Sequence, residues 1–322
     1  MDFGKWSTII KSYHNRALTS TEEMDWEKID EHEAINWFRE NYNIPFQLCA
    51  IYVIVIFGGQ YYMDTRERFD LRKPLLCWSA LLAVFSIIGS IRCWTIFWML
   101  YEEGGVRGII CSNQFYVRPV TRFWGFVFCL SKVPELVDTV FIVLRKQKLI
   151  FLHWYHHITV LLFSWHCYEG QRAGGAVFMT MNFIVHSMMY SYYACRAARV
   201  RVPRFIALIV TTFQILQMVL GVLTFYMLIQ WRNDDDCPST NQHLWYGGLM
   251  YSSYLVLFCH FFYLAYLKPP SPKTDPKATK TEKIENPETE KIMEAAEFPK
   301  RTLATGDSIN LRSRSKNIKS AF

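Results

Sequence analysis

Apolar residues in this chain are arranged in long blocks, separated by short charged segments. Seven blocks approach the roughly 20 residues that an α-helix needs to cross a bilayer. They are residues 44–63, 75–96, 123–144, 150–167, 173–195, 205–229 and 244–267. The composition agrees with a membrane protein, because 51% of the 322 residues are apolar, which is too hydrophobic for an ordinary soluble enzyme. We therefore predict an all-α, polytopic membrane protein with seven transmembrane helices.

The two ends of the chain differ from this hydrophobic region of residues 44–267. Residues 1–43 are polar, but Ala34, Ile35, Phe38 and Tyr42 follow one another at helical spacing. This spacing predicts an amphipathic helix on the membrane surface, with a solvated leader as the alternative. Residues 268–322 are rich in Pro, Lys, Glu and Thr and poor in apolar residues, which predicts a disordered tail.

Basic residues indicate the orientation, because loops rich in Lys and Arg stay on the cytosolic side. The loops after the first, third and fifth blocks are basic, whereas the sixth loop carries Asp234, Asp235 and Asp236. We expect a cytosolic C-terminus and an N-terminus in a lumen or outside. Of the nine cysteines, Cys111 and Cys237 are assigned to loops, both on the non-cytosolic side. An oxidising compartment predicts a disulfide between them, and two free thiols are the alternative.

Three histidines, His153, His156 and His157, lie at the start of the fourth block. At ~100° per residue their rings share one face of a helix. Titratable groups in a membrane helix are costly and mark a functional site by default.

Other blocks place polar side chains at a similar depth, ~10 to 20 Å from the cytosolic ends of the helices. They are Lys132, Glu135, Asp138, His186, Gln214, Gln217 and His260. The helix face that carries His186 also carries Asn182, Tyr190 and Tyr193. A shared cavity explains this common depth. The alternative is that they form interhelical hydrogen bonds and one Lys–Glu pair that hold the helices together.

Neutral imidazole can be a metal ligand, a proton shuttle or a nucleophile. The histidine cluster resembles an iron-dependent desaturase or hydroxylase at first sight, but the other histidines are too few and too scattered for a di-iron centre. A single metal ion stays open. A basic rim suits a polyanion such as coenzyme A, and a topology signal with lipid-headgroup contact is the alternative. The predicted rim residues are Arg145, Lys146, Lys148, Arg199, Arg201 and Arg204.

Five segments in this order resemble the successive motifs of the ELO family, the fatty acid elongases of the endoplasmic reticulum. They are KVPELVDT (132–139), LRKQ (144–147), HWYHH (153–157), NFIVHSMMYSYY (182–193) and TTFQILQ (211–217). The resemblance covers roughly residues 30–267 and is strongest to the animal branch that elongates saturated and monounsaturated palmitoyl-class chains. The tail after Lys268 is longer than that branch leads us to expect.

The resemblance implies a seven-helix enzyme of the endoplasmic reticulum membrane, with its N-terminus lumenal and six helices around a narrow acyl tunnel. Such an enzyme condenses a long-chain acyl-CoA with malonyl-CoA to 3-oxoacyl-CoA, CO2 and CoA, without a metal or other bound cofactor.

By resemblance, His156 is the nucleophile that forms an acyl-imidazole, and His186 is the second catalytic histidine. His153 and His157 orient the nucleophile, and Asn182 and Gln214 bind the oxyanion. The remaining site-shaping residues are Lys132, Glu135, Asp138, Tyr190, Tyr193 and Gln217.

The implied partners are the bilayer, the two CoA esters and the reductase and dehydratase of the elongation cycle, but no nucleic acid. A homodimer is left open.

A seven-helix receptor shares this topology, but a receptor site opens to the outside, whereas this polar layer lies toward the cytosol.

Overall fold

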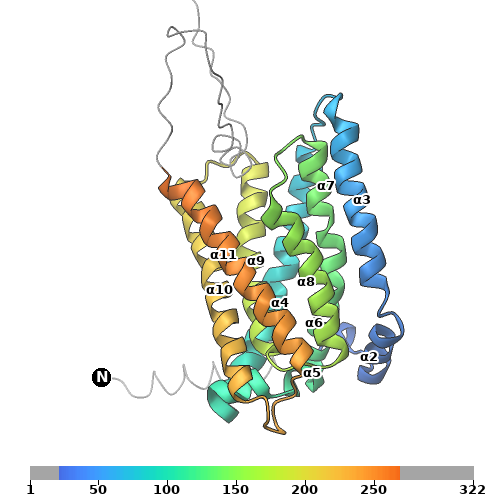
Figure 1. Ribbon diagram of the computed structural model, residues 1–322, viewed down its shortest axis with the longest axis vertical. Coiled ribbons are helices and arrows are strands. Elements are labelled where there is room, and N and C mark those ends of the chain that lie inside the picture. The colour runs from blue at the N-terminus through green and yellow to red at the C-terminus, as the bar shows by residue number, and fades with distance from the viewer. Residues whose placement is uncertain (1–21, 269–322) are drawn as a thin grey trace, which may run out of the picture.

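The computed structural model describes residues 22–268, and all regular secondary structure within that range is helical. Figure 1 shows the long helices side by side along the long axis of the molecule. The elements are η1 (Asp25–Glu27), α2 (Glu31–Glu40), α3 (Ile44–Asp64), α4 (Arg72–Cys111), α5 (Gln114–Val117), α6 (Pro119–Glu135), α7 (Val137–Leu144), α8 (Phe151–Glu169), α9 (Gly175–Ala197), α10 (Arg204–Gln230), α11 (Asn241–Phe262) and the π-helical turn η2 (Tyr263–Leu267). The all-α prediction is confirmed.

Four of the described helices are long and apolar enough to cross a membrane: α3, α4, α10, and α11 together with η2. The other three predicted spans are also helical, but one is divided into α6 and α7, and α8 and α9 carry many polar residues. The chain is therefore a multi-pass membrane protein. The count of seven spans stays a prediction.

The division between α6 and α7 follows from Pro134. Proline has no N–H to donate and its ring disfavours a continuing helix, so it commonly kinks one. The helix is interrupted at Leu136, and Glu135 and Asp138 lie on either side of the break. The break thus occurs within the motif that carries the acidic residues.

The long helix α4 changes direction at Gly105, where φ is 60° and ψ is −149°. Only glycine adopts this conformation without strain. Cys111 is the last residue of α4 rather than part of a loop, because the chain re-forms helix after Gly105. Its Sγ is bonded to that of Cys237, with the two Cα atoms 4.4 Å apart.

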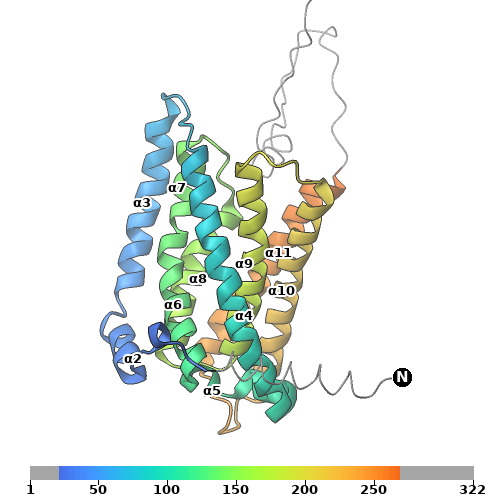
Figure 2. The same cartoon turned by 180° about the vertical axis from the view of Figure 1, so that it is seen from behind.

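The bundle has two ends that differ in charge. The basic end comprises the loops of residues 65–71, 145–150 and 198–203, and η2 lies there as well. The disulfide end comprises α2, α5 and the loop of residues 231–240, as Figures 1 and 2 show from opposite sides. The predicted disordered tail lies, apart from Lys268, outside the described residues.

Helix α2 occupies the position of the predicted amphipathic helix. The side chain of its N-cap, Asp30, accepts a hydrogen bond from the Glu33 N–H, which satisfies one of the free donors of the first turn. Phe38 is fully buried, with its ring centroid 4.4 Å from that of Trp165 and 4.5 Å from that of Tyr168. The buried side of α2 therefore packs against α8, and the placement of this helix on the membrane surface stays a prediction.

Candidate active site

A cavity of about 300 Å³ lies between the helices and reaches the basic end, where Arg145, Gln147 and Lys148 line it. It brings together most of the polar layer expected from the sequence. The predicted residues that line it are Asp138, His153, His156, His157, Asn182, His186, Tyr190, Tyr193, Gln214 and Gln217.

The three histidines of α8 lie against one another. The ring centroid of His157 is 4.5 Å from that of His153 and 5.6 Å from that of His156. Nε2 of His153 is 3.0 Å from Oγ1 of Thr139, which is 2.7 Å from the hydroxyl of Tyr52 on α3. One ring nitrogen of His153 is therefore occupied by a contact that fixes the ring.

His156 differs from His153. Among the described residues none forms a hydrogen bond to either of its ring nitrogens, although the ring lines the cavity. Its centroid is 5.0 Å from that of Tyr254, whose hydroxyl donates to the backbone oxygen of His156 at 3.3 Å. The backbone and ring are thus held in place while the nitrogens stay available.

A second polar network joins α6 to α9. Nζ of Lys132 donates to Oε1 of Glu135 at 2.8 Å and to Oδ1 of Asn182 at 3.0 Å. Nδ2 of Asn182 is 3.2 Å from Nε2 of His186, and Nδ1 of His186 is 3.9 Å from Oε2 of Glu135. Lys132 and Glu135 are buried behind the cavity wall and do not line it. They contact residues that do.

Asp138 is held by two donors from other helices. Its Oδ1 accepts from Nε1 of Trp78 and its Oδ2 from the hydroxyl of Tyr190, both at 2.7 Å. The contacts join α4, α7 and α9 at the cavity.

The six cations predicted for the basic rim differ in whether they line the cavity. Of the six expected cations, Arg145 and Lys148 line the cavity, whereas Lys146, Arg199, Arg201 and Arg204 do not. Lys146 has a φ of 52° just after α7, and its Nζ donates to the backbone oxygens of Asp64 and Arg66, each at 3.0 Å. The sharp turn directs its side chain toward the neighbouring loop.

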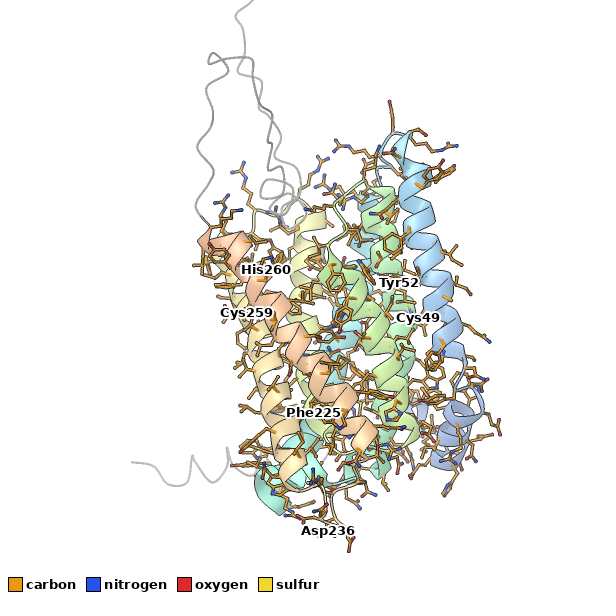
Figure 3. All side chains as sticks on the ribbon, viewed as in Figure 1. Cys49, Tyr52, Phe225, Asp236, Cys259 and His260 are labelled. Carbon is orange, nitrogen blue, oxygen red and sulfur yellow. A yellow bond between two sulfur atoms is a disulfide. The ribbon has the colours of Figure 1, made fainter. Side chains whose placement is uncertain are left out.

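His260 was expected in the same layer, and this was wrong. It is exposed near the basic end of α11, beside Cys259, and does not line the cavity (Figure 3). From the same end of the chain, Tyr266 of η2 lines the cavity instead, with its hydroxyl 3.2 Å from Oγ1 of Thr211. The π-helical turn shifts which residues face inward, which a regular 3.6-residue period does not predict.

Three further aromatic residues contact groups of the site without a signal in the sequence: Tyr52, Trp78 and Tyr254. An aromatic residue in a span has the same pattern whether it faces lipid or donates a hydrogen bond to an active-site group, so no local signal distinguished them.

A smaller, mostly apolar cavity of about 50 Å³ extends toward the disulfide end. Asn182 lines both cavities. The second is lined further by Val160, Phe163, Phe178 and Met179, among others. Within residues 22–268 no three His, Cys, Asp or Glu side chains are grouped closely enough to hold a metal ion.

Comparisons with a family model and with individual relatives identify the same family. The model of the ELO (GNS1/SUR4) family matches residues 37–274. The chain is 49% identical to very long chain fatty acid elongase 6 of Gallus gallus over 274 residues, which is 84% of this chain and 100% of the relative. It is 50% identical to the Homo sapiens elongase 6, covering 79% of this chain and 96% of the relative. It is 44% identical to elongase 3 of Mus musculus, covering 72% and 86%.

The family match covers most of the helical region and includes all five motifs that carried the resemblance. The chain therefore belongs to the ELO (GNS1/SUR4) family of fatty acid elongases.

Proposed function

We propose that this protein is a 3-oxoacyl-CoA synthase that condenses a long-chain acyl-CoA with malonyl-CoA. The observation that supports this most is the position of His156, an imidazole without a hydrogen-bond partner among the described residues, in a cavity that reaches the basic end. A nucleophile needs a free lone pair, and a CoA ester needs both an apolar space for its chain and cations near its phosphates.

In this proposal a ring nitrogen of His156 attacks the thioester carbon, and CoA leaves as a thiol after taking up a proton. Malonyl-CoA then loses CO2, and the resulting carbanion attacks the acyl carbon of the acyl-imidazole. The bond between the acyl carbon and the ring nitrogen of His156 breaks, that nitrogen takes up a proton, and 3-oxoacyl-CoA is released. The amide N–H groups of Asn182 and Gln214 are the donors for the developing oxyanion, and His186 assists as acid or base.

The two cavities support the placement of the substrates. Arg145 and Lys148 at the cavity mouth bind the CoA phosphates, and the thioester reaches the histidines. The acyl chain continues past Asn182 into the second, mostly apolar cavity. The resemblance of the motifs to the branch that elongates palmitoyl-class chains makes palmitoyl-CoA the first substrate to test.

The membrane setting is part of the same proposal. We place the protein in the endoplasmic reticulum with seven spans, six of them around the tunnel. The basic end is cytosolic, where CoA esters are available, and the disulfide between Cys111 and Cys237 faces the oxidising lumen. The reductase and dehydratase of the elongation cycle would take up the product.

The test is incubation of the purified protein in lipid nanodiscs with palmitoyl-CoA and malonyl-CoA, following CO2 release and 3-oxostearoyl-CoA. His156→Ala and His186→Ala should each abolish both products while the variants unfold at the same temperature as the parent. Full activity in His156→Ala contradicts the nucleophile assignment. Stoichiometric iron in the purified protein, with desaturated or hydroxylated products, would favour the desaturase alternative.

A further inference from the structure

Asn182 links Lys132 of α6 to His186 of its own helix α9. A lysine ammonium can only donate hydrogen bonds, so the atom of Asn182 that faces Lys132 is the amide oxygen. The NH2 group then faces Nε2 of His186 at 3.2 Å. An amide NH2 also only donates, so Nε2 of His186 must accept, and the proton of the neutral ring is on Nδ1.

Glu135 supports the same assignment. Its Oε1 accepts from Lys132 at 2.8 Å and from the hydroxyl of Ser131 at 3.0 Å. Its Oε2 is buried without a hydrogen-bond partner and lies 3.9 Å from Nδ1 of His186. A buried carboxylate oxygen at that distance favours the ring form that has its proton on Nδ1.

We infer that Lys132 is a positioning residue that, through Asn182 and Glu135, holds His186 in the Nδ1–H form and leaves Nε2 as its basic nitrogen. The assignment of the proton follows from the contacts, and its consequence for catalysis depends on the proposed condensation reaction. Nε2 is then the atom of His186 that accepts a proton during turnover. The second N–H of Asn182 is not needed by His186 and is free to bind an oxyanion.

The test is 15N NMR of the full-length protein in lipid nanodiscs, with 15N-labelled histidine. The chemical shifts distinguish a protonated from an unprotonated ring nitrogen. The signals of His186 are assigned by their absence in His186→Gln. We expect the parent protein to show a protonated Nδ1 and an unprotonated Nε2 at His186.

Two variants change the network at different points. In Asn182→Asp the new carboxylate accepts from Lys132 but cannot donate to Nε2, so the proton of His186 should move to Nε2. In Lys132→Met the amide is no longer fixed, so the Nδ1–H signal should weaken. In the same variant kcat for condensation should fall roughly 10-fold or more with little change in KM, which is typical of impaired proton transfer rather than impaired binding.

Ser131→Ala is the matched control, because it removes the other donor to Oε1 of Glu135 and leaves the contact between Lys132 and Asn182 intact. It should keep the Nδ1–H form. A proton on Nε2 in the parent protein, or a Nδ1–H form unchanged in Asn182→Asp, overturns the inference. The NMR result does not depend on turnover, so a protein with the expected proton position but no condensation activity would contradict the proposed function alone.

Discussion

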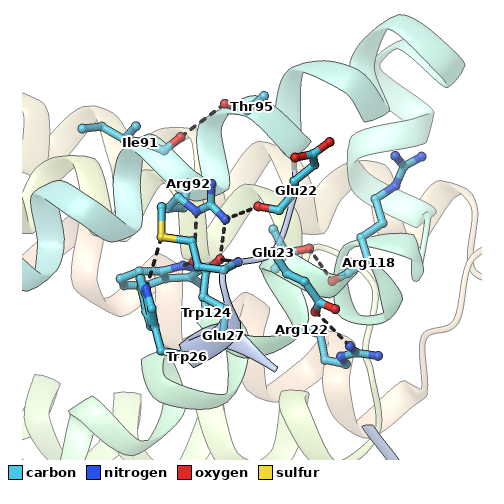
Figure 4. A network of polar contacts seen from close by, with 12 residues as sticks. Glu22, Glu23, Trp26, Glu27, Ile91, Arg92, Thr95, Arg118, Arg122 and Trp124 are labelled. Carbon is cyan, nitrogen blue, oxygen red and sulfur yellow. Dashed lines mark hydrogen bonds and ion pairs between the residues drawn. The ribbon is translucent and has the colours of Figure 1, made fainter. Parts of the chain in front are cut away.

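The carboxylate of Glu27 and the guanidinium of Arg92 form a buried ion pair between segments 65 residues apart. Nε of Arg92 donates to Oε1 of Glu27 at 2.9 Å, and Nε1 of Trp124 donates to the same oxygen at 2.7 Å (Figure 4). The Met24 N–H donates to Oε2 at 2.9 Å. The segment before α2 is thereby attached to α4 and α6 at the disulfide end.

Removing one partner of this pair should destabilise the protein strongly. Arg92→Met or Glu27→Gln leaves a buried group without its counter-ion, which typically costs about 3–5 kcal/mol. The double variant should lose less than the sum of the two single losses. The measurement is thermal unfolding of the detergent-solubilised protein. Lys28→Met, which removes an exposed pair with Asp25, is the control and should change little. If all three single variants lower the unfolding temperature by the same small amount, the buried pair does not stabilise the protein more than the exposed one.

The same pair predicts a pH dependence of stability. Burial alone raises the pKa of Glu27, but the hydrogen bonds from Arg92, the Met24 N–H and Trp124 outweigh it, so the pKa lies below the ordinary value of 4.5. A carboxyl group whose pKa is lower in the folded than in the unfolded protein stabilises the folded protein at any pH above the unfolded-state pKa. This stabilisation is lost as the pH falls below that value and through the folded-state pKa. The difference in unfolding temperature between the parent and Glu27→Gln should therefore shrink below about pH 4.5. A constant difference down to about pH 3 would contradict this cause.

The disulfide between Cys111 and Cys237 closes a loop across 126 residues and joins the end of α4 to the loop before α11. Cross-links of this kind typically contribute about 2–5 kcal/mol. Reduction should therefore lower the unfolding temperature of the parent protein. It should not change the unfolding temperature of the Cys111→Ser/Cys237→Ser variant, which cannot form the disulfide. Cys259→Ser, at an exposed free cysteine, is the control. If reductant does not change the unfolding temperature of the parent protein, the disulfide does not contribute this stability.

The positions of the helices and of most cavity residues were predictable because a bilayer imposes a fixed length on each span and a high cost on polar groups within it. His153, His156, His157 and His186 were recognisable for that reason. The structure places them around one cavity.

Partners from distant segments were not predictable. Arg92 lies inside the predicted span of residues 75–96, and its partner was missed because the counter-ion Glu27 lies in a polar segment with no periodic link to that span. His260 was misplaced because the helical period predicts which residues share a face but does not determine which face of α11 is turned inward. Both errors arise from long-range packing, which local patterns do not record.

Close packing of α4 against α9 gives a further prediction. A Cβ added at Gly89 would lie 2.6 Å from the ring of Phe183. Gly89→Ala should therefore destabilise the protein by about 1–3 kcal/mol through overpacking. Gly58 has open space around it, so Gly58→Ala should be neutral or slightly stabilising, because alanine is the better helix former. Thermal unfolding of both variants measures the difference. An equal response of the two would show that the helices can move apart at little cost.

The second cavity makes a prediction about chain length, which depends on the proposed condensation reaction. Val160 lines this cavity one turn beyond His156, next to Phe163. Val160→Phe should fill the space that the distal part of the acyl chain occupies, and it should leave the histidines in place. The ratio of kcat/KM for palmitoyl-CoA to that for lauroyl-CoA should then fall roughly 10-fold or more, since pocket contacts with a few methylene groups carry discrimination of that size. Val219→Phe makes the same substitution on an exposed face of α10 and should leave the ratio unchanged. If Val160→Phe lowers both kcat/KM values equally, the second cavity does not hold the end of the chain.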